Sequence, residues 1–183
     1  YRRWSEEHPP SGDDRDAATA QAAPAPPSAM FFISYSRTTD QRCALKVRDA
    51  LTRLGVGEHE IWFDRVTLKV GDVFDRRIAD GIRTCRYFLP LVSRAATDRD
   101  EAFVFREWEA ATKTLPSINT MKRRWLVPLV VDAEHRPESY EQASVREWCE
   151  RGINFGHAPE GEPDGATLES LKLLVRDARV PKA

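Results

Sequence analysis

The stretch MFFISYS, residues 30–36, is the clearest indication of the fold in this sequence. It is short, apolar and rich in β-forming residues, so it predicts a buried first strand. Asp40 is placed to cap a helix after it, and Gly55 to end that helix. Between them, apolar residues recur at helical spacing: Ala44, Val47, Leu51 and Leu54. The chain therefore opens with one strand and one amphipathic helix.

The same alternation continues along the chain. Further strands are predicted at residues 60–66, 86–93 and 125–132, and a short one from Ile153. The helical stripes are Phe74, Ile78, Ile82 and Cys85; Val104, Trp108, Ala111 and Leu115 within residues 101–115; and Leu168, Leu171, Val175 and Ala178. Pro90 and Pro128 count against central positions for their strands, because proline removes a ladder donor. Strands alternating with helices predict an α/β domain with a doubly wound parallel sheet and helices on both faces.

Composition limits the possible partners and the domain organisation. The 183 residues carry 28 basic and 29 acidic side chains, and this balance gives no case for binding nucleic acid or an anionic membrane surface. No apolar run is long enough to span a membrane and no secretory signal is visible, so we expect a cytoplasmic protein. Residues 1–29 contain five prolines and no Val, Ile, Leu, Phe or Met. They are predicted to form a disordered linker or the tail of an upstream region, and residues 30–180 a single domain.

Several kinds of site are excluded by motif. The three cysteines, Cys43, Cys85 and Cys149, are far apart and form no CxxC pair, so we expect reduced thiols and no metal centre. There is no GxGxxG after the first strand, no GxxxxGK[ST] and no GxSxG, which disfavours dinucleotide-binding Rossmann domains, P-loop enzymes and α/β-hydrolases. The first loop also lacks the acidic residues of a phosphoacceptor receiver domain.

Ligands of doubly wound sheets bind beyond the carboxyl ends of the strands, so the loops after Ser34, Asp64, Ser93 and Asp132 are the candidate positions. The first loop, SYSRTTD, is suited either to an anion or to simple helix capping with a solvated Arg37. The second loop, DRVTLKVGDVF, carries apolar residues among charges. These side chains form either an interface patch or a satellite of the core.

Glu107 is the unusual residue of the helix EAFVFREWEAATK. Phe103, Glu107 and Ala110 form a stripe at the border between the core face and solvent. Glu109 has Lys113 one turn on, whereas Glu107 has apolar neighbours at the corresponding positions. Glu107 is therefore either a carboxylate tuned for chemistry beside an aromatic ring or a plain surface glutamate of a good helix former.

These segments, in this order, resemble the TIR (Toll/interleukin-1 receptor) domain family, above all its bacterial members. FFISYSR is similar to the first-strand box, IWFDRVTLKVGDVF to the second strand and BB loop, FLPLVS to the third strand, and FVFREWEAA to the helix that carries the catalytic glutamate. The resemblance covers residues 31–178 and implies a flavodoxin-like sheet of five parallel strands. The departures are Phe103, where enzymatic members often have Trp, Lys69, where some have an acid, and a proline in each of two strands.

The resemblance implies an enzyme that cleaves NAD+ at the nicotinamide–ribose bond, with NAD+ as substrate and no cofactor. Glu107 takes the catalytic position. The matching substrate-binding positions are Tyr35, Ser36, Arg37, Asp64, Lys69 and Phe103, and those of a BB-loop interface are Leu68, Val70 and Gly71. Such domains act as self-associated assemblies, so TIR–TIR contacts, an upstream sensor or oligomerisation domain and a role in bacterial antiviral defence or signalling are expected.

Two alternatives remain open at this level. A non-enzymatic TIR scaffold for protein–protein signalling has the same BB loop and does not need the glutamate. A nucleoside-processing enzyme such as a deoxyribosyltransferase shares the fold and the glutamate chemistry, but gives no reason for the BB-loop box.

Overall fold

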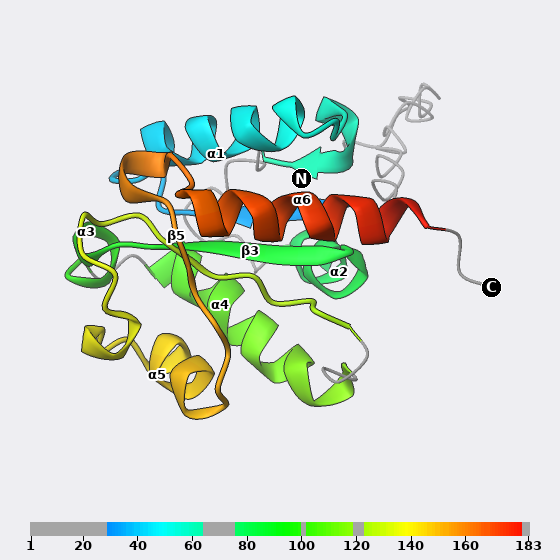
Figure 1. The fold of residues 1–183 in the computed structure, drawn as a ribbon. Coiled ribbons are helices and arrows are strands. Elements are labelled where there is room, and N and C mark those ends of the chain that lie inside the picture. Colours follow the sequence, from blue (N-terminus) through cyan, green and yellow to red (C-terminus); the bar gives the residue numbers. More distant parts are fainter. Residues whose placement is uncertain (1–28, 64–75, 100–101, 119–122, 181–183) are drawn as a thin grey trace, which may run out of the picture.

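A computed structural model describes residues 29–63, 76–99, 102–118 and 123–180, which form a sheet between two layers of helices (Figure 1). The strands are β1 Phe31–Ser34, β2 Ile61–Trp62, β3 Tyr87–Val92, β4 Leu129–Val130 and β5 Gly156–His157. The helices are α1 Gln41–Arg53, α2 Arg76–Thr84, α3 Arg94–Thr97, α4 Ala102–Thr114, α5 Ala143–Glu150 and α6 Gly165–Arg179. Short 3₁₀ turns occur at η1 Glu58–Glu60, η2 Leu115–Ser117, η3 Pro137–Ser139 and η4 Pro159–Gly161.

The described strands form one parallel sheet in the order β2-β1-β3-β4-β5, which is the flavodoxin-like order. The predicted five-stranded, doubly wound α/β fold is therefore confirmed. Strand order reverses between β1 and β3, which pair from Phe31 opposite Tyr87 to Ser34 opposite Pro90. This reversal is the topological switch point, so the carboxyl ends of β1 and β3 flank the place where such sheets bind ligands.

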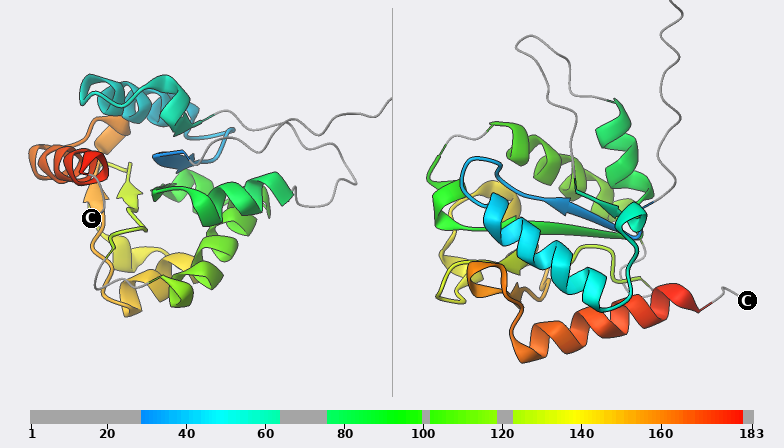
Figure 2. Two further views of the ribbon diagram at one scale, coloured as in Figure 1. Left: turned by 90° about the vertical axis from the view of Figure 1, so that its right-hand side faces the viewer. Right: turned by 90° about the horizontal axis from the view of Figure 1, so that it is seen from above.

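Period-two alternation along the strands builds two hydrophobic cores. Phe31 and Ile33 pack with α1 and α6, whereas Phe32 packs with α2, α4 and α5 on the other face. Figure 2 shows the same division, with α1 and α6 on one side of the sheet and α4 and α5 on the other. By the same alternation Ser34 faces α4, while Tyr35 belongs to the core under α1. Which side chains meet at the switch point thus follows from strand geometry.

Pro90 lies in the central strand, contrary to the objection drawn from its missing N–H. The direction of the backbone explains this. The Phe88 N–H donates to the Trp125 carbonyl on the side of β4, and Pro90, two residues later, points to the same side. On that side the pairing is interrupted between the Phe88–Leu126 bridge and the resumption at Leu91. The donor missing at Pro90 falls in this gap. The sheet accepts the proline at the cost of a broken β3–β4 ladder.

Several predicted elements differ from the observed ones. The strand predicted at residues 125–132 is reduced to β4, because Pro128 lacks the N–H needed to extend it. The strand expected from Ile153 begins only at Gly156, since Ile153 and Phe155 pack into the core beside α5. Helix α5 was not predicted at all, and the strand predicted at 60–66 is described only as β2, with residues 64–66 outside the described ranges.

Helix α6 forms as predicted, and its predicted stripe faces the core except at the first residue, Leu168. Leu171, Leu174 and Val175 are buried, whereas Leu168 is 38% exposed.

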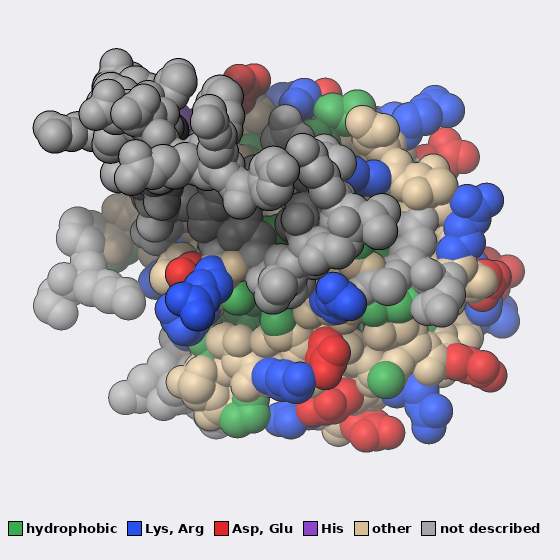
Figure 3. All heavy atoms as spheres, turned by 180° about the vertical axis from the view of Figure 1, so that it is seen from behind, with side chains coloured by type: hydrophobic (Ala, Val, Ile, Leu, Met, Phe, Trp, Pro, Cys, Tyr) green, Lys and Arg blue, Asp and Glu red, His purple; other side chains and the backbone are tan. Residues whose placement is uncertain are grey.

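None of the described helices combines the length and the apolarity that crossing a bilayer requires. On the face opposite to that of Figure 1, basic and acidic side chains are interspersed wherever described residues are visible (Figure 3). The predicted linker of residues 1–29 lies, except for Ala29, outside the described ranges and stays a prediction.

Candidate functional site

The Glu107 carboxylate lies against the carboxyl end of β1. Helix α4 carries Glu107 across the face of the sheet, and the Ser34 hydroxyl donates a hydrogen bond to Glu107 Oε2 over 2.5 Å. Both residues are fully buried. Two residues 73 positions apart in the chain are thus joined at the switch point of the sheet.

Trp108 fixes the direction of that hydrogen bond. Its indole Nε1–H donates to Ser34 Oγ over 3.1 Å. Because an indole N–H can only donate, this contact uses an acceptor position of Ser34, and the single hydroxyl hydrogen is left for Glu107. The order Trp108 to Ser34 to Glu107 therefore follows from the donor chemistry, and it directs a positive hydrogen toward the carboxylate.

Trp108 is itself held from the far side of the core. Its ring packs at an angle on that of Trp148, with centroids 5.7 Å apart. The Trp148 indole N–H donates to Thr112 Oγ1 over 2.9 Å, and Thr112 Oγ1 donates to the Trp108 carbonyl over 2.8 Å. Trp108 and Trp148 are fully buried. The donor that orients Ser34 thus sits in a packed aromatic cluster.

The prediction that Glu107 lies at the border between core and solvent is wrong. Its side chain has 0% exposure, because the stripe containing Phe103 and Glu107 also faces the sheet and its neighbouring helices. Phe103, one turn before Glu107, is half-buried against the same core. The expected pair of Glu109 with Lys113 is confirmed at 2.6 Å on the exposed side of α4. The alternative of an ordinary solvent-exposed glutamate thus describes Glu109 and not Glu107.

The first loop is held by its own hydroxyl groups. Ser36 Oγ accepts from the Thr39 N–H at 3.1 Å and from the Thr39 hydroxyl at 2.8 Å. Asp40 is the N-cap residue of α1 as predicted, but its side chain makes no capping hydrogen bond. Asp40 Oδ2 instead accepts from the Ser93 hydroxyl at 2.8 Å, and both residues are buried. This bond ties the loop after β1 to the end of β3.

Tyr35 and Arg37 have opposite environments. The Tyr35 ring is buried and stacks on Phe63 with centroids 5.2 Å apart. The Arg48 guanidinium lies 5.1 Å from the centroid of the same Phe63 ring. Arg37 is exposed. Asp64, Leu68, Lys69, Val70 and Gly71, which complete the predicted substrate and interface sets, lie outside the described residues.

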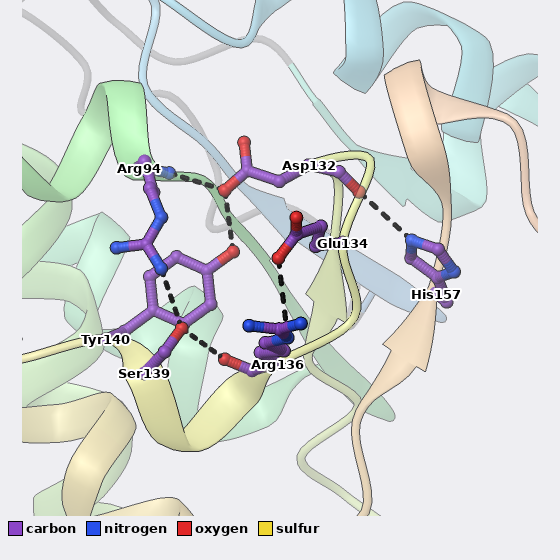
Figure 4. A network of polar contacts seen from close by, with 7 residues as sticks. All are labelled: Arg94, Asp132, Glu134, Arg136, Ser139, Tyr140 and His157. Carbon is purple, nitrogen blue, oxygen red and sulfur yellow. Dashed lines mark hydrogen bonds and ion pairs between the residues drawn. The ribbon is translucent and has the colours of Figure 1, made fainter.

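A second polar cluster at the carboxyl edge centres on Asp132, after β4 (Figure 4). Asp132 Oδ2 accepts from the Tyr140 hydroxyl at 2.6 Å and from the Arg94 backbone N–H at 2.8 Å. The Arg94 guanidinium donates to Ser139 Oγ at 2.8 Å and lies over the Tyr140 ring. Burial, and then the hydrogen bond to Asp132, raise the pKa of Tyr140. A cavity of about 230 Å³ lies beside these residues.

The sequence predicts the ends of these strands but not the side chains that meet there. It places Ser34, Ser93 and Asp132 only at the starts of candidate loops, and Trp108 only in the core. The signal was available for Ser34: a serine in phase with Phe32 on an otherwise apolar strand must face the helix layer. Tyr140 and Arg94 gave no comparable signal, because their contacts depend on the irregular chain before α5.

No group of three or more His, Cys, Asp or Glu side chains is arranged to hold a metal ion within the described ranges. The three cysteines form no disulfide. Burial raises the pKa of the Cys85 thiol to about 12. A thiol in such surroundings stays protonated, which makes it a poor nucleophile or metal ligand at neutral pH.

Comparison with known proteins identifies the family. A family model for the TIR domain matches residues 31–160. The NAD(+) hydrolase TcpC of Escherichia coli O6:H1 strain CFT073 is 38% identical over 63 residues, which make up 34% of this chain and 20% of TcpC. The aligned part thus spans about a fifth of that relative.

The TIR domains of the activated Roq1 resistosome, which directly recognizes the pathogen effector XopQ, superpose with a TM-score of 0.52. The match covers 81% of this chain and 98% of that chain at 11% identity, so it shows the fold alone. The family model spans most of the chain, and the sheet order and helix layers agree with it. The chain therefore belongs to the TIR domain family.

Proposed function

We propose that this TIR domain cleaves NAD+ between the ribose and nicotinamide, with Glu107 as the catalytic carboxylate. The observation that carries the proposal is the buried Glu107 carboxylate, which accepts the Ser34 hydroxyl at the switch point of the sheet. The similarity of a 63-residue segment to a protein named NAD(+) hydrolase supports the same activity. The proposal requires no metal and no cofactor besides the substrate.

The reaction needs a negatively charged carboxylate and does not need a general acid that protonates the leaving group. Nicotinamide leaves as a neutral molecule when the ribose C1′–nitrogen bond breaks, so its departure requires no proton. Positive charge then develops at the ribose, and a carboxylate beneath the ring stabilises it as in glycoside hydrolysis. This stabilisation is stronger in a buried site than in water, because the effective dielectric constant is lower. Water or an adenine nitrogen completes the reaction, giving ADP-ribose or a cyclic form.

Ser34 is the proposed positioning residue for Glu107. Its hydroxyl hydrogen is committed to Glu107 Oε2 by the indole N–H of Trp108 on its other side. The hydrogen bond from Ser34 gives the carboxylate a defined orientation, in which it is proposed to face the ribose. Ser34 itself makes no contact with substrate in this scheme.

The remaining substrate contacts are proposed from the first loop and from α4. Arg37 is an exposed cation suited to the diphosphate, and Phe103 supplies an aromatic face one turn from Glu107. Tyr35 and Ser36 are buried, so we propose that they shape the loop and offer backbone groups to the nucleotide. Asp64 and Lys69 complete the proposed set from outside the described residues.

Activity is proposed to depend on self-association. Glu107 has no exposed surface, so the substrate reaches it only when neighbouring groups are displaced. We propose that TIR–TIR contacts through Leu68, Val70 and Gly71, driven by an upstream sensor or oligomerisation domain, favour that displaced state. A cytoplasmic role in bacterial antiviral defence or signalling would follow from such control.

The direct experiment measures nicotinamide release from NAD+ at high protein concentration. The proposal expects release by the wild-type chain and its loss in Glu107→Ala. Glu109→Ala is the matched control, because Glu109 lies on the same helix but pairs with Lys113 in solvent. Absence of release from a self-associated wild-type sample, or equal release by Glu107→Ala, contradicts the proposal.

The complete burial of Glu107 also favours a second candidate, a TIR scaffold in which this carboxylate only stabilises the fold. A scaffold needs no substrate access to Glu107. It predicts that Leu68→Asp abolishes self-association and signalling, while a folded Glu107→Gln variant signals normally. A cellular effect that requires Glu107 in a stably folded protein excludes it.

A further inference from the structure

A cavity of about 580 Å³ opens at the amino ends of the strands, on the edge of the sheet opposite to Glu107. Figure 2 (left) looks onto this edge, with α6 on one side and α5 below. The cavity lies between α6 and the segments that precede β4 and β5. Its apolar lining includes Trp125, Leu126, Leu129, Phe155, Leu171 and Leu174. The volume is in the range of small-molecule sites.

Two arginines, Arg123 and Arg124, supply the charged part of the lining. Arg123 is half-buried, and its Nη2 donates to the Cys85 carbonyl at 2.7 Å and to the Arg86 carbonyl at 3.1 Å. The guanidinium is therefore held in place before any ligand arrives. Burial, followed by the nearby charge of Arg86, lowers the pKa of Arg123.

Arg123 and Arg124 line the cavity and Arg86 lies near Arg123, and no acidic side chain of the described residues pairs with any of the three. Within the described ranges no Asp or Glu is among the residues that line the cavity. The Nε atoms of Arg86 and Arg123 are buried and make no hydrogen bond. Elsewhere in the fold arginines do find carboxylates, as Arg179 does with Glu60 at 2.6 Å. Neighbouring cations that are partly desolvated and unpaired favour binding of an anion.

We infer that this cavity binds a small amphipathic anion, with a phosphate or carboxylate head at Arg123 and Arg124 and an apolar ring or chain beside Trp125 and Leu174. The guanidinium groups match the geometry of such heads, and the apolar walls match the remainder of the ligand. The cavity and Glu107 lie at opposite ends of the strands, so this site is separate from the proposed NAD+ site. The inference holds whether or not the chain is an enzyme.

Naphthyl phosphate, followed by the indole N–H signal of Trp125 in NMR, provides the test. We expect saturable shifts and binding about tenfold or more tighter than that of naphthol, which lacks the anion, or of inorganic phosphate, which lacks the ring. Arg124→Gln and Ser170→Trp should each weaken binding, because the first removes an exposed charge and the second fills the cavity from α6. Arg53→Gln, an exposed arginine away from the cavity, should have no effect.

Three results would overturn the inference. Equal affinities for naphthol and naphthyl phosphate would show that the cavity binds apolar rings but has no anion site. Binding that survives both Arg124→Gln and Ser170→Trp would place the ligand elsewhere, and an unmoved Trp125 signal would show no binding in the cavity. Both variants alter exposed positions, so folding is not at risk as it would be at Arg123. Binding is expected to persist in Glu107→Gln, which separates this test from the test of NAD+ cleavage.

Discussion

The hydrogen-bond series from Trp108 through Ser34 to Glu107 is the feature on which the proposed chemistry depends. Each group has one role available to it: the indole only donates, the hydroxyl passes on its single hydrogen, and the carboxylate accepts. The arrangement requires that the last residue of β1 be small and hydroxylated and that it face α4. A serine at position 34 meets both conditions.

Replacement of Ser34 by Ala tests this positioning role. We expect kcat for NAD+ cleavage to fall about tenfold or more while KM changes little, because the carboxylate loses its fixed orientation and not the substrate contacts. The free energy of unfolding should fall by about 1–3 kcal/mol, since a buried hydrogen bond to a charged group is lost. Ser117→Ala, at an exposed serine, is the control. A change in KM alone would show that Ser34 contacts substrate and does not position Glu107.

The Tyr140–Asp132 pair makes a pH-dependent prediction. The pKa of Tyr140 is raised in the folded protein by burial and by its bond to Asp132, so the stability it contributes is complete below the unfolded value of about 10. As pH rises beyond that value, the unfolded chain releases the proton first and this stability is lost. Tyr140→Phe should be less stable than the wild type at pH 7 by about 1–2 kcal/mol.

That difference should shrink above pH 10, because the variant has no phenol to titrate. Denaturant unfolding of both proteins from pH 7 to pH 11 measures it. A difference that stays constant across this range would mean that Tyr140 titrates alike in the folded and unfolded states.

Helix α2 approaches β2 closely at Gly81. A Cβ placed on Gly81 would lie 2.1 Å from the Trp62 ring, which in turn packs on Phe32. Gly81→Ala should therefore cost about 1–3 kcal/mol of stability through overpacking. Gly165, in the first turn of α6, has open space around it. Gly165→Ala should leave stability unchanged or raise it by about 0.5–1 kcal/mol. Thermal unfolding that ranks the two variants in the reverse order would contradict this packing.

Some of the strands and helices can be predicted from local sequence, and others cannot. Residues of β1 and β3 alternate between two cores, and this period-two pattern, together with the stripe on α4, was readable from the sequence. Helix α5 was not readable, because its eight residues bury only Ser144, Val145 and Trp148, too few for a clear period. The reduced length of β4 depends on the relative positions of Pro90 and Pro128, which each remove a backbone N–H from one of two neighbouring strands.

For the whole molecule, the fold class follows from the alternation of strands and helices, whereas the site follows from long-range contacts. The parallel sheet, ordered β2-β1-β3-β4-β5, agrees with the flavodoxin-like sheet that the resemblance to TIR domains implies. The partnership of Ser34 with Glu107 and that of Asp40 with Ser93 join residues 73 and 53 positions apart. Neither can be read from periodicity within one element, because each arises only when α4 and β3 are docked beside β1. The complete burial of Glu107 has the same origin.

Glu107→Gln tests whether the Glu107 carboxylate performs the proposed cleavage of NAD+. Glutamine keeps the size and the hydrogen-bond acceptor for Ser34 but removes the negative charge. With thermal stability matched to that of Glu109→Gln, we predict that nicotinamide release by Glu107→Gln falls by about 10²–10³-fold in kcat/KM, while Glu109→Gln keeps wild-type activity. Wild-type nicotinamide release by a folded Glu107→Gln protein would contradict the account.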